Sequence, residues 1–265
     1  DINMELCLKV ISGNQQTIVE KSGKDEVNLY YDKEYQEGDV IVFEASEKNT
    51  HFWLQVDDAL GKSLVYITGT FKYQIPFGEK RYNLSSKAFS GSNHLIYVRV
   101  ARDYEIKPYR NLSLNVNDQH GDTHCYPHAS ANVETRGETV FAAKNAIDGV
   151  TANESHGEWP YQSWGINRQK DAALKIEFGR QIVTDRIVLY TRADFPHDNW
   201  WKKVTFTFSD GSTLEGIMEK SRLPHEFTFE SKVISWVEIG ELIQSEEESP
   251  FPALTQMEVY GHDID

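Results

Sequence analysis

The sequence predicts an all-β protein made of two β-sandwich domains, and three observations support this. Short β-rich runs recur about every ten residues along the first third of the chain, with Gly, Asn and Pro turns between them. Similar runs fill the second half, where a helical period is visible only at Thr139–Ala146. The chain has 265 residues, of which 39% are hydrophobic, and this is enough for two domains with separate cores.

Strands are expected in the first half wherever apolar and polar residues alternate or β-branched residues gather. The predicted strands are Leu6–Ile11, Val27–Tyr31, Asp39–Glu44, Phe52–Val56, Leu64–Thr68 and His94–Val100. From Ala101 to Tyr109 the pattern gives way to charged residues and to Pro108. We therefore expect an N-terminal antiparallel sandwich at 1–108, whose role the sequence leaves open, and a second domain at 109–265.

The second half shows the same kind of strand pattern. Its predicted strands are Leu174–Phe178, Arg186–Thr191, Val204–Ser209, Glu226–Phe229, Ser235–Ile239 and Thr255–Tyr260.

Charge and composition exclude several classes of partner. The chain has 27 Lys and Arg against 41 Asp and Glu, a net charge of −14. Such a surface repels phosphate backbones and anionic lipid headgroups, so neither nucleic acid nor a membrane is expected as a partner. No run approaches the roughly 20 apolar residues of a spanning helix. The two cysteines, Cys7 and Cys125, lie far apart, so no disulfide framework is expected.

The N-terminus lacks the charged and apolar regions of a signal peptide. Met4 is consistent with a natural start behind three extra residues, and both observations predict a cytoplasmic protein. A secreted fragment would show the same features, so that alternative stays open.

A series of short motifs occurs in a specific order along the second half. The motifs are Ser130-Ala131-Asn132, Asn145-Ala146-Ile147-Asp148-Gly149, Ser163-Trp164-Gly165, Leu174–Gly179, Asp185–Tyr190, Val204–Ser212 and Glu258–Gly261. Over residues 110–262 this order resembles the discoidin, or coagulation factor 5/8 type C, domains and the related family 32 carbohydrate-binding modules. The resemblance implies a galactose-binding-like, eight-stranded jelly roll whose end loops hold a ligand.

The resemblance also implies a structural calcium ion. In such domains the Ala-x-Asp-Gly loop and a Glu of the last strand contribute to the site, and here these are Asp148 and Glu258, with Thr151 as a further oxygen donor. A hard cation with oxygen ligands suits this set. The alternative is that Asp148-Gly149 is only a tight turn that ends the helix Thr139–Ala146.

Two loops are rich in aromatic and hydrogen-bonding side chains, as a sugar site requires. One loop contributes Trp159 and Tyr161. The other loop lies between two predicted strands, and its candidate ligand-binding residues are Arg192, Asp194, His197, Asp198 and Trp200. The alternative is an internal network in which Arg192 pairs with Asp194 or Asp198 only to hold the loop. Trp164 is expected in the core, and alternation places one of Trp200 and Trp201 inward.

Two further clusters contain side chains that occur in reactive sites. His120, His124, Cys125 and His128 lie close together, but their spacing matches no tetrahedral zinc pattern. Asp57-Asp58 and Asp194 with Asp198 could form the acid–base pair of a glycosidase, which needs two carboxyl groups. Asp57-Asp58 fits a hairpin turn better.

The sequence therefore predicts a non-catalytic binding protein that recognises a carbohydrate through the end loops of its second domain. One alternative is a small carbohydrate-active enzyme with its site between the two domains. Another is a protein–protein adhesion module, because fold alone does not decide function. The oligomeric state is left open.

Overall fold

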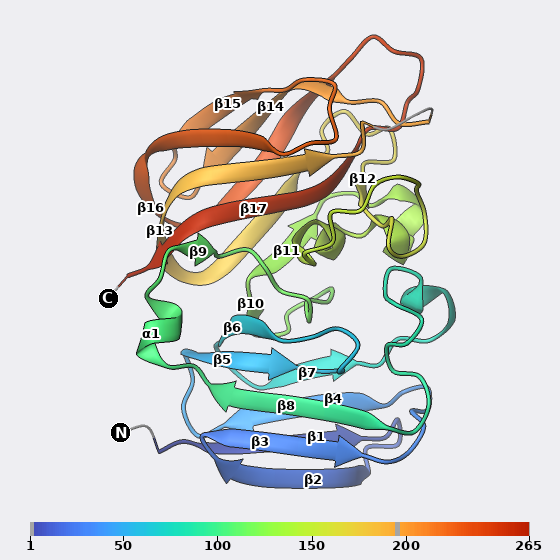
Figure 1. The fold of residues 1–265 in the computed structure, drawn as a ribbon, viewed down its shortest axis with the longest axis vertical. Helices are drawn as coiled ribbons and strands as arrows, with labels where there is room; N and C mark the ends of the chain where they lie inside the picture. The colour runs from blue at the N-terminus through green and yellow to red at the C-terminus, as the bar shows by residue number, and fades with distance from the viewer. Residues whose placement is uncertain (1–2, 194–196, 265) are drawn as a thin grey trace.

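The computed structural model describes residues 3–193 and 197–264. It contains two β-sandwiches, one above the other along the longest axis of the molecule (Figure 1). The chain is almost entirely strand and loop, which confirms the predicted all-β class. No helix among the described residues is long and apolar enough to cross a lipid bilayer.

The N-terminal sandwich packs a four-stranded sheet against a five-stranded one. The first sheet has the order β2 (Thr17–Lys24), β1 (Glu5–Ile11), β4 (Val40–Ala45), β7 (Phe71–Gln74). The second has the order β10 (Cys125–Tyr126), β6 (Ser63–Ile67), β5 (Thr50–Gln55), β8 (His94–Val100), β3 (Glu26–Tyr31). All six predicted strands are present. The prediction missed β2, a polar edge strand, and β7, which has only four residues.

The described part of the C-terminal sandwich contains eight strands, as predicted. They are β9 (Arg110–Asn111), β11 (His128–Ala131), β12 (Trp164–Gly165), β13 (Leu174–Thr191), β14 (Trp201–Phe208), β15 (Thr213–Ile217), β16 (His225–Gln244) and β17 (Ala253–Asp263). The main path runs β12-β17-β13-β16-β14-β15, with β11 on β13 and β9 on β17.

Two of these strands are much longer than the sequence pattern predicted. The expected strands Leu174–Phe178 and Arg186–Thr191 are the two ends of β13, and β16 likewise joins two expected strands. The pairing of β13 with β16 shifts register after Glu177, and Gly179 follows with a φ of +69°. At this bend a Cβ on Gly179 would lie 2.4 Å from the ring of Tyr126, so the close packing requires glycine.

Among the described residues, helical structure is confined to short turns. The predicted helix at Thr139–Ala146 is two 3₁₀ segments, η3 (Thr139–Phe141) and η4 (Ala143–Ile147), separated by an extended Ala142. The other turns are η1 (Gly78–Arg81), α1 (Asp103–Ile106) and η2 (Thr135–Gly137).

The N-terminal sandwich includes residues beyond the expected domain boundary at residue 108. Strand β10 lies beyond it in sequence but pairs with β6 of the N-terminal sandwich, and Cys125 is part of that sandwich's core. The amide of Asn117 donates to the backbone oxygen of Leu54 at 3.0 Å. A segment of the second predicted domain thus completes the first sandwich. This segment, β10, shares backbone hydrogen bonds with β6.

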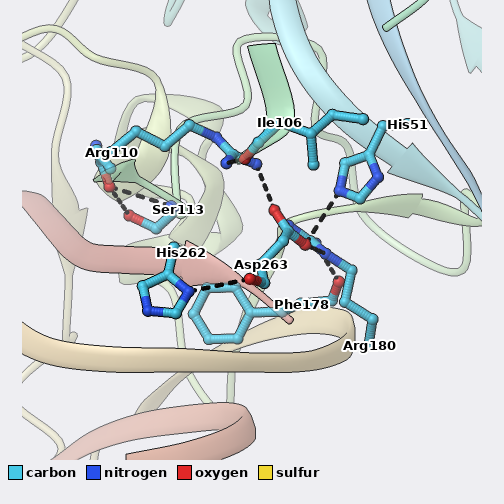
Figure 2. A network of polar contacts seen from close by, with 9 residues as sticks. His51, Ile106, Arg110, Ser113, Phe178, Arg180, His262 and Asp263 are labelled. Atoms are coloured by element: carbon cyan, nitrogen blue, oxygen red, sulfur yellow. Dashed lines mark hydrogen bonds and ion pairs between the residues drawn. The ribbon is translucent and has the colours of Figure 1, made fainter. Parts of the chain in front are cut away.

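A second contact between the sandwiches is centred on Asp263, near the end of β17 (Figure 2). Its carboxylate accepts hydrogen bonds from Arg110 and from Arg180, and it lies 3.1 Å from Nε2 of His51 on β5. Burial alone would raise the pKa of Asp263, but the His51 and Arg180 contacts hold it well below its usual range. Burial lowers the pKa of His51, and its hydrogen bond with Asp263 opposes this shift.

We predict that Asp263→Asn lowers the free energy of unfolding by about 3 kcal/mol, because it removes the buried carboxylate that partners two guanidiniums, whose side chains are only 20% and 11% exposed. The depressed pKa of Asp263 means that this stabilisation is complete above its ordinary pKa of 3.8 and declines as the pH falls below it. Urea denaturation at pH 7 measures the loss. Glu230→Gln, at an exposed position, is the control; equal stability of the two variants would contradict the prediction.

Candidate functional site

A pocket of about 290 Å³ lies where loops meet at one end of the C-terminal sandwich. Its walls come from the turn at η2, the turn after β12, and the segments that follow β13 and precede β17. The volume is close to the lower end, about 300 Å³, of small-molecule pockets in general. This is the end at which the sequence predicted a ligand.

A buried ion pair contributes to the pocket lining. Arg192 directly follows β13 and its side chain is 1% exposed, yet it borders the pocket. Its Nε lies 3.3 Å from Oδ2 of Asp198, and its Nη1 donates to the backbone oxygen of Tyr161 at 3.0 Å. The backbone N–H of Arg192 donates to the oxygen of Ala253. Arg192 therefore connects the segment between β13 and β14 with the loop of Tyr161 and with the first residue of β17.

Two aromatic rings and two further guanidiniums also line the pocket. Phe251 stands between Pro250 and Pro252 and is 44% exposed. The guanidinium of Arg168 lies 5.0 Å from the centre of its ring, within cation–π distance. Arg136 has the same relation to Phe141, at 5.4 Å.

The backbone of the pocket is strained at three residues that are not glycine. Arg136, Asn167 and Arg168 line the pocket with φ values of +53°, +49° and +60°. Such conformations cost free energy and persist where the surrounding structure fixes them, often at ligand sites. The backbone N–H of Asn167 donates a hydrogen bond to Oγ1 of Thr135 at 3.0 Å.

The structure divides the predicted ligand-binding residues into two groups. Arg192, His197 and Asp198 line the pocket. His197 is exposed, and its ring meets that of His156 edge to face at 5.3 Å. The predicted pocket residue Asp194 lies outside the described residues.

Three predicted residues do not line the pocket. Tyr161 contributes its backbone oxygen to Arg192. Trp159 is 44% exposed, and its backbone N–H donates to the backbone oxygen of Tyr82 in the N-terminal sandwich at 2.8 Å. Trp200 is half-buried, and its backbone N–H donates a hydrogen bond to Oδ1 of Asn199.

The core tryptophans are where the sequence placed them. Trp164 and Trp201 are 0% and 1% exposed, with ring centres 6.4 Å apart. This confirms that Trp164 belongs to the core and that one residue of the Trp200-Trp201 pair points inward.

Sequence reasoning missed Arg136, Phe141, Asn167, Arg168 and Phe251. A signal existed for Phe251, because an aromatic residue between two prolines is held in place at low entropic cost. Asn167 and Arg168 directly follow the Trp164-Gly165 motif and its neighbour Ile166, but nothing in that pattern distinguishes them from an ordinary polar turn.

The donors around Asp148 do not fit a calcium ion. Oδ2 of Asp148 accepts from Nε2 of Gln162 at 2.7 Å, while Oδ1 accepts from the Val150 N–H and from Nε2 of Gln256. The side chain of Glu258 has its hydrogen bond with Tyr260, and Thr151 is exposed. Across the described ranges, no group of three or more His, Cys, Asp or Glu side chains could hold a metal.

The amide nitrogen of Gln256 occupies the place where oxygens converge. It lies 2.6 Å from the Asn145 oxygen and 2.7 Å from both the Thr255 oxygen and Oδ1 of Asp148, while Gly149 N–H donates to its Oε1. Rotating this amide would set its oxygen against three acceptors, so the hydrogen bonds fix its orientation. The turn, with Gly149 at a φ of +81°, matches the alternative to calcium that the sequence left open.

The other clusters have separate partners. His120 pairs with Glu134 and His128 with Asp118, each at 2.7 Å, so the histidines do not converge. Asp57 accepts from the Ala59 N–H in the turn between β5 and β6, which confirms the predicted hairpin.

A second cavity, of about 620 Å³, lies between the two sandwiches. Among its described lining residues Glu37 is the one carboxylate.

No family model and no curated protein matches the sequence. Similar solved structures include a chitosan-binding module of a chitosanase/glucanase from Paenibacillus sp. IK-5 (18% identity, 57% of this chain and 99% of that one, TM-score 0.40). Others are the family 32 module of C. perfringens NanJ in complex with galactose (22%, 50% and 91%, 0.37) and a Streptococcus pneumoniae fucose-binding module (13%, 58% and 99%, 0.41). These are carbohydrate-binding modules, the kind of domain that the motif order resembles.

We predict that removing calcium leaves the melting temperature unchanged, because amide hydrogens satisfy the Asp148 carboxylate. Thermal unfolding with EDTA and with 1 mM calcium tests this. If calcium bound with a Kd 100-fold below its concentration, it would stabilise the fold by about 2.7 kcal/mol. Gln256→Glu should be strongly destabilising without calcium, because its carboxylate would face three acceptors. A melting temperature that falls with EDTA in the wild type would show an ion.

Arg192→Ala should cost about 3 kcal/mol of stability, because it removes a buried guanidinium and leaves Asp198, whose side chain is 11% exposed, without this partner. Chemical denaturation measures the change. Arg222→Ala, at an exposed ion pair with Glu154, is the matched control and should cost less than 1 kcal/mol. Equal losses in the two variants would show that the Arg192 network does not hold the loops.

Proposed function

We propose that the protein binds a carbohydrate in the end pocket and does not transform it. The observation that carries this proposal is the combination, in one pocket, of an exposed aromatic ring with a fixed set of hydrogen-bonding groups. The ring is Phe251, and the polar groups include Arg192, His197 and Asp198.

This combination suits the chemistry of a sugar. A pyranose has an apolar C–H face, which packs against an aromatic ring, and a rim of hydroxyls, which both donate and accept hydrogen bonds. Guanidinium N–H groups donate to hydroxyl oxygens, and a carboxylate such as that of Asp198 accepts from hydroxyl hydrogens. The pocket offers both kinds of partner beside the ring.

The pocket is also largely formed before a ligand arrives. Arg192 is held by Asp198 and by the Tyr161 oxygen, and Phe251 is held between two prolines. Groups that are already ordered lose little conformational entropy on binding, which favours affinity in a small site.

The distribution of carboxylates supports binding rather than hydrolysis. A glycosidase needs two carboxyl groups on either side of the scissile bond. Of the described residues that line the end pocket, Asp198 alone carries a carboxylate, and Arg192 neutralises it. The alternative prediction was an enzyme with its site between the two domains. Among the described residues that line the cavity there, Glu37 alone carries a carboxylate.

A glycan array with the full chain, followed by calorimetry on the bound glycans, tests the proposal. Phe251→Ala should weaken binding at least tenfold and leave the melting temperature within about 2 °C, because the ring is half exposed and its loss opens no core cavity. Tyr104→Ala removes a 71% exposed ring on α1 and should change neither quantity. Binding that survives Phe251→Ala, or an array without any bound glycan, would refute the proposal.

A further inference from the structure

We infer that the pocket selects an acidic saccharide, a sugar that carries a carboxylate, and that Arg168 is the group that recognises this charge. The inference rests on the proposed function, because it names the class of carbohydrate for the same pocket.

The first step is the charge balance of the pocket. Three guanidiniums line it, and two have carboxylate partners within the protein. Arg192 pairs with Asp198, while Arg136 makes two hydrogen bonds to Glu138, at 2.6 and 3.1 Å. Over residues 3–193 and 197–264, Arg168 forms no ion pair and its side chain makes no hydrogen bond. One positive charge therefore remains for a ligand.

The second step is the placement of that charge. Arg168 is exposed, and its guanidinium lies 5.0 Å from the centre of the Phe251 ring. Contact with the ring restrains the planar guanidinium and uses none of its five N–H donors. The left-handed backbone at Asn167 and Arg168 holds the side chain's origin at the pocket wall. A ligand against Phe251 is thus within reach of a guanidinium whose hydrogen bonds are unused.

The third step is the kind of group that satisfies it. A guanidinium presents parallel N–H donors that match the two oxygens of a carboxylate, and such charge-assisted pairs are stronger than bonds to hydroxyls. The protein has a net charge of −14, so an acidic ligand is repelled by most of the surface. Local attraction at Arg168 would make the pocket the place where such a ligand binds.

Matched pairs of sugars test the inference with the full chain. Glucuronic acid and glucose differ at C6, where a carboxylate replaces a hydroxymethyl group, and galacturonic acid and galactose form a second pair. We expect the acid of at least one pair to bind about tenfold more tightly than its neutral partner in calorimetry or ligand-observed NMR. Raising the salt from 20 to 500 mM should reduce this preference, because salt screens the charge.

Arg168→Gln should abolish the preference, so that the acid and the neutral sugar of each pair bind with equal affinity. Glutamine has the same backbone strain at this position, so the loop is kept. Arg168→Lys should retain part of the preference, because it keeps the charge but loses the two parallel donors. Lys170→Gln removes the same charge from an exposed neighbour that does not line the pocket, and should have no effect.

The outcomes separate this inference from the proposed function. Neutral sugars that bind as tightly as their acids, or a preference that survives Arg168→Gln, would overturn the acidic class while carbohydrate binding stands. If neither sugar of either pair binds and the array is also empty, the proposed function fails as well.

Discussion

A guanidinium that is 1% exposed needs acceptors for its N–H groups, and the end of the C-terminal sandwich is arranged around this requirement at Arg192. Strand β13 delivers Arg192 to the end of the sheet. The Asp198 carboxylate then approaches from the loop before β14, and the Tyr161 oxygen approaches from a loop of the other wall. The pocket is the space that these loops leave between them. Stability and the candidate function therefore depend on the same ion pair, and the functional and structural explanations of this loop do not exclude each other.

The same constraint is met differently at Asp148. Burial raises the pKa of its carboxylate to about 6, and hydrogen bonds from Gln162, Val150 and Gln256 oppose that rise. A buried carboxylate can be stabilised by a cation or by N–H donors, and here two side-chain amides supply the donors. The resemblance that pointed to calcium concerned the turn at Asp148, together with Thr151 and Glu258. Which group satisfies the turn depends on side chains that come from distant parts of the chain.

Much of the fold could be predicted because alternation along a strand is a local property. Leu6, Leu8 and Val10 of β1 point into the core, and the sequence shows this directly. The bend in β13 was less visible, since Gly179 is equally compatible with a turn between two strands. Arg192 could be found from its position after a strand, whereas Arg168 and Phe251 come from loops without periodicity. Only the tertiary fold brings the Arg168 guanidinium to 5.0 Å from the centre of the Phe251 ring.

The N-terminal sandwich acquires a role from its contacts with the segment that borders the pocket. Nδ2 of Asn83 donates to Oδ1 of Asn145 at 2.9 Å, and both side chains are buried. The hydroxyl of Thr139 donates to the Glu79 oxygen at 2.8 Å. Asn145 also donates to the oxygens of Thr139 and Ser163, so it joins η3 to the loop before β12. Phe141 is the last residue of η3 and lines the pocket. Because a buried amide without its partner costs free energy, the first sandwich stabilises one wall of a pocket that it does not line.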